Sequence, residues 1–245
     1  MDFHCHLDLY PNAREVYKEA CRRNAFTWLV TTSPKAFEAT SRILGSSSNV
    51  LITPGLHPEI AHERFGELDL LLKQIATVRA VGEVGLDGSS RFRATYEVQH
   101  KVFSAVVARC EELGGRTLSI HSRQAVTYVL AELSMHPRFG TAVLHWFSGT
   151  AAELKAADAQ GCWFSVGPAM FNSKSGRALA ARLPRDRVVP ESDGPFAQLG
   201  GKPIMPWSMP ETARYLAEAW SVPIDNAMHV LENNSLRLLD LMQLS

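Results

Sequence analysis

Residues 1–8 read MDFHCHLD, which places His4 and His6 on either side of Cys5 close to the start of the chain. Chain ends are usually frayed and carry few functional groups. If the segment is a strand, His4 and His6 share one face and Cys5 points to the other. Two imidazoles on one face can bind a single metal ion, although such a pair is, by itself, more often incidental. The rest of the chain decides between these interpretations.

The composition is that of an ordinary globular protein, with 245 residues of which 46% are apolar and 20% are charged. A single α/β barrel commonly has about this length. Lys and Arg number 25, as do Asp and Glu, so the formal net charge is zero. The overall charge therefore favours neither nucleic acid nor a membrane surface, and a site for a polyanion needs a local cluster or a metal ion.

Cysteine usage and the N-terminal sequence indicate where the protein works. The four cysteines are far apart and form no C-x-x-C pair, so buried free thiols in a reducing compartment are expected. The N-terminus has no secretory signal, and no apolar run is long enough to span a bilayer. The sequence thus predicts a cytoplasmic protein with no membrane contact.

Short apolar segments alternate with amphipathic helical patterns along the chain. Strands are predicted at residues 1–5, 26–32, 49–55, 79–85, 117–121, 141–147, 162–167 and 187–192. Helices are predicted at residues 12–23, 33–44, 65–75, 94–113, 123–133, 150–160, 173–183, 206–220 and 223–242. This order predicts an α/β fold, a TIM-type (β/α)₈ barrel that forms a single domain over residues 1–245. An open doubly wound sheet is the alternative, but it usually carries a glycine-rich loop after its first strand, where this chain has HCHLD.

Polar residues that can bind metals follow the predicted strands. These residues are His4, His6, His57, Glu83, Asp87, His121, His145, Glu191 and Asp193. In an α/β barrel the carboxyl ends of the strands converge on one face, where active sites are built. A single histidine at a strand end often has only a structural role. Glu83, between Gly82 and Gly85, is harder to explain in that way, because buried carboxylates are rare unless they are paired. Imidazole suits zinc and carboxylate suits magnesium or manganese, so the set predicts one or two divalent ions.

Seven motifs in this order resemble those of the TatD family of metal-dependent deoxyribonucleases, within the wider amidohydrolase-like superfamily. They are HCHLD at 4–8, GLHP at 55–58, GEVGLD at 82–87, SIHSR at 119–123, VLHWFSG at 143–149, VGP at 166–168 and ESDGP at 191–195. The resemblance covers nearly the whole chain. It implies a metal-dependent barrel that hydrolyses DNA phosphodiesters as a 3′-to-5′ exonuclease, with single-stranded DNA favoured as the substrate.

The resemblance also assigns roles to residues. The metal ligands it implies are His4, His6, Glu83, His121, His145 and Asp193. They would hold two divalent ions (Mg, Mn or Zn), with Glu83 bridging them and with Asp193 as the catalytic base. His57 would line the substrate pocket, and Arg123 would contact a phosphate, which suits its planar guanidinium.

Departures from the family pattern lie on the substrate side. Gly88 stands where relatives commonly have an aromatic residue, which would reshape the mouth of the pocket, and Ser192 replaces a threonine. Divergent members of this family occur in bacterial anti-phage cassettes of the Qat type. The resemblance therefore permits a role in antiviral defence, with other products of the cassette as partners, and the neighbouring genes are the test of it.

Two other functions are compatible with the sequence. An amidase or deacylase on the same barrel often bridges its metals with a modified lysine on the fourth strand, but residues 76–90 contain no lysine. A metal-stabilised subunit of a larger assembly would need no catalysis, yet the complete set of ligands argues against an inactive site.

Overall fold

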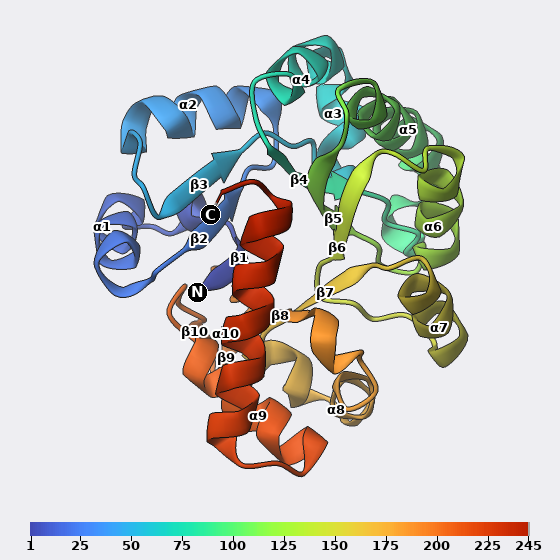
Figure 1. The fold of residues 1–245 in the computed structure, drawn as a ribbon. Coiled ribbons are helices and arrows are strands. Elements are labelled where there is room, and N and C mark those ends of the chain that lie inside the picture. The colour runs from blue at the N-terminus through green and yellow to red at the C-terminus, as the bar shows by residue number, and fades with distance from the viewer. Residues whose placement is uncertain (245) are drawn as a thin grey trace.

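A computed structural model describes residues 1–244 and contains eight parallel strands that alternate with helices (Figure 1). The strands are β1 (Asp2–Cys5), β2 (Thr27–Val30), β3 (Val50–Thr53), β4 (Ala80–Gly85), β5 (Arg116–His121), β6 (Gly140–Leu144), β7 (Trp163–Val166) and β8 (Val188–Pro190). Six of these strands lie inside their predicted segments, and β5 and β6 begin one residue earlier than predicted. The eight predicted strands are therefore confirmed.

Most of the helices lie around the outside of the ring of strands, and the last one crosses an end of the ring (Figure 1). The helices are α1 (Ala13–Arg23), α2 (Pro34–Leu44), α3 (Ala61–Arg64), α4 (Leu68–Ile75), α5 (Tyr96–Glu112), α6 (Val126–Met135), α7 (Ala151–Ala159), α8 (Lys174–Ala180), α9 (Met209–Trp220) and α10 (Ile224–Leu241). The sequence did not predict α3 or the short antiparallel hairpin of β9 (Gln198–Leu199) and β10 (Lys202–Pro203). None of the helices in residues 1–244 is long and apolar enough to cross a membrane.

The strands close into a barrel through two irregular junctions. Regular pairing gives one run of β1-β2-β3 and another of β4-β5-β6-β7-β8. At the first junction, the Gly82 N–H donates to the carbonyl of Pro54 at 2.9 Å. At the second, the Asp193 N–H donates to the carbonyl of His4 at 2.9 Å. The ring is therefore continuous, so the barrel prediction is confirmed and the open sheet is wrong.

The carboxylate of Asp2 joins the first strand to the segment after the last. One oxygen accepts the N–H of Ser192 at 3.0 Å, and the other accepts the Ser192 hydroxyl. Asp2 is buried, and burial raises its pKa to about 7 even though the hydrogen bonds from Ser192 lower it. The Ser192 hydroxyl is the group that a threonine would also supply, so this departure from the family pattern leaves the junction intact.

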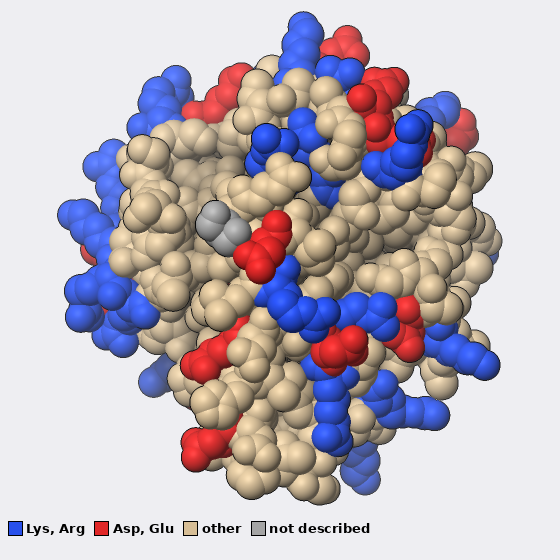
Figure 2. All heavy atoms as spheres, viewed as in Figure 1, with Lys and Arg blue, Asp and Glu red and all other residues tan. Residues whose placement is uncertain are grey.

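The end of the barrel where the strands begin is apolar. Trp28, Val143, Trp163 and Val189 pack there with Leu238 of α10, and α10 crosses this end of the barrel (Figure 1). Figure 2 shows the same face, on which Lys and Arg side chains are interspersed with Asp and Glu and form no single basic surface. The polar groups that could perform chemistry gather at the opposite, carboxyl ends of the strands.

Candidate metal centre

Glu83 lies at the centre of the cluster because β4 is irregular at this point. The pairing of β4 with β5 shifts register between Val81 and Val84, and an irregularity of this kind re-aims the side chains within it. Glu83 therefore points into the barrel, where it is 1% exposed. Gly82 leaves room for this arrangement, since a Cβ there would lie 2.8 Å from the Cβ of Ser119.

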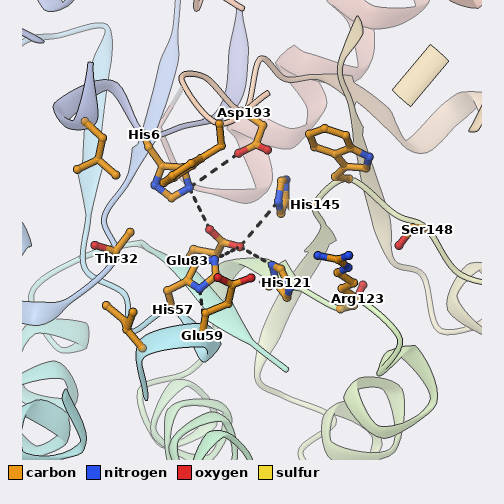
Figure 3. A pocket seen from close by; sticks show the side chains of 15 residues that line it. His6, Thr32, His57, Glu59, Glu83, His121, Arg123, His145, Ser148 and Asp193 are labelled. Carbon is orange, nitrogen blue, oxygen red and sulfur yellow. Dashed lines mark hydrogen bonds and ion pairs between the residues drawn. The ribbon is translucent and has the colours of Figure 1, made fainter. Parts of the chain in front are cut away.

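One carboxylate oxygen of Glu83 faces His4 of β1 and His6 just after it, and Figure 3 shows its approach to His6. Oε2 lies 3.1 Å from His6 Nε2 and 3.5 Å from His4 Nε2. Asp193 closes this group, with its Oδ1 3.7 Å from His4 Nε2 and 3.9 Å from His6 Nε2. Cys5 points away into a separate apolar cluster, as the alternation of a strand predicts.

The other oxygen of Glu83 faces histidines from three further strands (Figure 3). Oε1 lies 3.0 Å from His121 Nδ1, 3.2 Å from His57 Nε2 and 3.8 Å from His145 Nε2. The ring of His145 also stacks on that of His4 at 3.7 Å. Glu83 therefore connects two groups of imidazoles, one at each of its oxygens.

Three histidines are held from behind by side chains that lie outside the predicted ligand set. Their partners are Asp87 on His121 Nε2 (2.9 Å), Glu191 on His145 Nδ1 (2.9 Å) and the Ser119 hydroxyl on His4 Nδ1 (2.7 Å). Such partners fix the orientation and tautomer of a metal-binding histidine. Ser119 was detectable in the sequence, because it stands two residues before His121 and so shares its face of β5.

His57 differs from the other histidines in its hydrogen bonding. Its Nδ1 accepts the backbone N–H of Glu59 at 3.2 Å. In a neutral imidazole the proton then lies on Nε2, the nitrogen that faces Glu83. His57 is therefore arranged as a hydrogen-bond donor to Glu83 Oε1, 3.2 Å away, and with Glu83 and His121 it also forms one of the groups that could hold a metal.

The charges in the cluster depend on one another. Burial acts to raise the pKa of Glu83, but His57, His121 and His4 outweigh it and hold that pKa well below its ordinary value. Burial acts to lower the pKa of His145, but Glu191 and Asp193 raise it to about 10. Burial raises the pKa of Asp193 to about 7, against the lowering effect of His145 and His6. The pKa of each group is therefore set by its neighbours in the cluster as well as by its burial.

The donor set fits divalent metal ions. Three overlapping groups have ligand atoms within 4.8 Å of one another: His4, His145 and Asp193; His4, His6 and Glu83; and His57, Glu83 and His121. His4 Nε2 and Glu83 Oε2 are buried and lack a hydrogen-bond partner among the described residues. Buried polar atoms normally have partners, and a cation between the imidazole and the carboxylate would satisfy both. Mixed imidazole and carboxylate ligands suit zinc, manganese or magnesium.

The cluster forms the floor of a cavity of about 740 Å³. Arg123 lines the cavity with an exposed side chain, and Figure 3 places it on the far side of Glu83 from His6. The structure also explains why position 88 is a glycine in this chain, because a Cβ there would overlap the carbonyl oxygen of Gln124. All eight residues selected from the sequence therefore line one pocket or its floor.

Replacing Glu191 with alanine is expected to weaken the binding of Mn²⁺ about 10- to 100-fold, the usual cost of losing a group that orients a metal-binding histidine. His145 loses the acceptor for its Nδ1 proton, and the Trp146 N–H loses its partner at 3.1 Å. Titration calorimetry measures the affinity. Glu97→Ala, which removes an exposed glutamate paired with Lys101, is the matched control. Unchanged affinity in Glu191→Ala would contradict the role of Glu191.

Comparison with known proteins adds an independent line of evidence. The family model described as TatD related DNase matches residues 1–240. Human deoxyribonuclease TATDN3 is 26% identical over 261 residues, covering 97% of this chain and 93% of that protein. The 3′-5′ ssDNA/RNA exonuclease TatD of Pectobacterium parmentieri is 32% identical over 182 residues, covering 68% of each. The crystal structure of YJJV, a TatD homologue from Escherichia coli K12, superposes with a TM-score of 0.84 at 24% identity, covering 96% of this chain and 95% of that one.

Proposed function

The chain belongs to the family of TatD-related DNases, and on that premise we propose that it removes nucleotides from the 3′ end of single-stranded DNA by hydrolysing phosphodiester bonds. The observation that carries the proposal is Glu83, whose two oxygens face two separate groups of imidazoles at the base of an open pocket. Relatives named as 3′-5′ ssDNA/RNA exonucleases support the polarity and the single strand.

Two divalent ions would fit this set of donors. His4, His6, Asp193 and Glu83 Oε2 would hold one, and Glu83 Oε1, His121 and His145 would hold the other. When bound, such ions polarise a phosphoryl oxygen and make water a stronger nucleophile at neutral pH. Because Glu83 is buried and fixed on β4, it would set the separation between the two positions.

Asp193 is our candidate for the general base. Its carboxylate lies beside His4 and His6 at the floor of the pocket, within reach of a water molecule there. The backbone holds it in place, since the Asp193 N–H bonds to the His4 carbonyl at 2.9 Å. A carboxylate in contact with both a metal ion and a water molecule would be able to take a proton from that water.

Two further side chains would bind the substrate. Arg123 offers an exposed guanidinium at the pocket, a group suited to paired hydrogen bonds with a phosphate. His57 would donate its Nε2 proton to a phosphate oxygen above Glu83. Both assignments keep the roles that the sequence predicted. His57 also lies next to Glu83, at the centre of the cluster, with its Nε2 3.2 Å from Glu83 Oε1.

The test uses purified full-length protein, stripped with a chelator and reloaded separately with Mg²⁺, Mn²⁺ or Zn²⁺. A 5′-labelled single-stranded oligonucleotide should shorten progressively from its 3′ end, and a phosphorothioate at the last linkage should slow the first cut. Duplex DNA, single-stranded RNA and an acyl-ester panel are run in parallel. Acyl cleavage without any nuclease activity would refute the proposal in favour of an amidase or deacylase.

The cellular setting stays a prediction. The sequence predicts a cytoplasmic enzyme and permits a role in an anti-phage cassette with other proteins as partners. The genes beside this one, and the location of a fluorescent fusion, are the observations that test those two points.

A further inference from the structure

Phe196 is a large apolar residue in an unusual position. Its side chain is 60% exposed, yet it lines the same pocket as the metal-binding cluster. Its ring centroid lies 5.0 Å from that of His6, with the two planes at 76°. An exposed aromatic ring beside a buried polar centre leaves one of its surfaces free for a ligand.

The backbone around Phe196 holds the ring in this position. Its neighbour Ala197 is 2% exposed, and the Ala197 N–H donates to the carbonyl of Asp193 at 2.8 Å. The Ile204 N–H in turn donates to the carbonyl of Ala197 at 3.0 Å. Tyr10 donates its hydroxyl to the carbonyl of Ile204 from below. The exposure of Phe196 is therefore built into a packed segment.

The two walls of the pocket differ in chemistry. Leu9, 43% exposed, and the partly buried Ile60 line the pocket together with Phe196. Arg123 lies across the cluster from His6, the residue that Phe196 contacts (Figure 3). A ligand that spans the pocket therefore meets the flat apolar ring of Phe196 beside His6 and the cation of Arg123 across the cluster from His6. A nucleotide has this pair of features, since its base has an apolar face and its phosphate is an anion.

We propose that the exposed ring of Phe196 is the surface on which the unpaired base of the 3′-terminal nucleotide stacks while the scissile phosphate lies over the cluster. The inference rests on the proposed nuclease function and adds a determinant of specificity to it. A base held in a duplex has its faces covered by its neighbours, so it must leave the helix before it reaches the ring. Stacking on an aromatic residue tolerates all four bases, so the enzyme would select an unpaired end and ignore its sequence.

The test compares Phe196→Ala and Phe196→Trp with wild type on two single-stranded oligonucleotides, one of them abasic at its 3′-terminal nucleotide. On the normal substrate, Phe196→Ala should raise KM about 5- to 150-fold, the range for losing one stacked base. On the abasic substrate, wild type should already show this higher KM, and Phe196→Ala should raise KM no further. Phe196→Trp should restore the normal KM. Phe65→Ala, which removes another phenylalanine that is 43% exposed but does not line the pocket, is the matched control.

The outcomes separate this inference from the function beneath it. Suppose that wild type cleaves the normal oligonucleotide. If Phe196→Ala then raises KM by the same factor on both substrates, or raises it on neither, the stacking surface is refuted and the proposed nuclease function stands. If wild type cleaves no DNA under any metal, both proposals are refuted. Metal content and the melting temperature of Phe196→Ala should match those of wild type, since a loss of either would mean that the ring is structural.

Discussion

Replacing Glu83 with glutamine is expected to reduce DNA hydrolysis about 10³-fold or more, the scale of losing a group central to a catalytic site. The amide keeps the size of the side chain but loses the charge that both groups of imidazoles face. Bound metal should fall in the same variant, because a neutral amide is a poor bridge between two cations. Elemental analysis of the dialysed protein and the 5′-labelled oligonucleotide assay measure the two effects.

The chain contains a close control for this substitution. Glu132 on α6 is also 1% exposed, but it lies beside His100, outside the metal centre. Glu132→Gln therefore removes a buried carboxylate without touching the pocket, and its metal content and activity should stay near those of wild type. If Glu83→Gln retained full metal and full activity, the assignment of the centre would be wrong.

Replacing Gly85 with alanine is expected to lower the free energy of unfolding by about 3 kcal/mol or more, because steric overlap and a forbidden backbone conformation add together. Gly85 has φ +137°, which side chains rarely adopt, and a Cβ there would overlap the carbonyl oxygen of His121. Relief of that overlap must move β4 away from β5, so metal affinity should fall along with stability. Urea unfolding measures the first effect, and calorimetry measures the second.

Gly66→Ala is the matched control, since a Cβ at Gly66 has nothing within 4 Å and the backbone there is compatible with a side chain. Its free energy of unfolding should lie within about 0.5 kcal/mol of wild type. Equal stability of the two variants would mean that the close approach of β4 and β5 at Gly85 is easily relaxed.

The sequence predicted the strands well because each is a short apolar run, and it placed the candidate ligands together because they lie at the downstream ends of those runs. Gly82 and Gly85, which flank Glu83 in the sequence, lie where neighbouring strands approach closely. The sequence could not assign partners across strands. That Asp87 holds His121 and Glu191 holds His145 depends on how β4, β5, β6 and β8 meet in space. The donor role of His57 likewise depends on a backbone N–H, that of Glu59, which no pattern of side chains reveals.

The junction between β1 and β8 has a consequence for biosynthesis. His4 is synthesised with β1, whereas Asp193, which bonds to its carbonyl, follows only after β2 to β8 have also been made. A nascent chain thus presents a pair of histidines long before it can offer the enclosing carboxylates. Loading with metal is therefore expected to follow ring closure, because Asp193 joins His4 and His6 only when the β1–β8 junction forms.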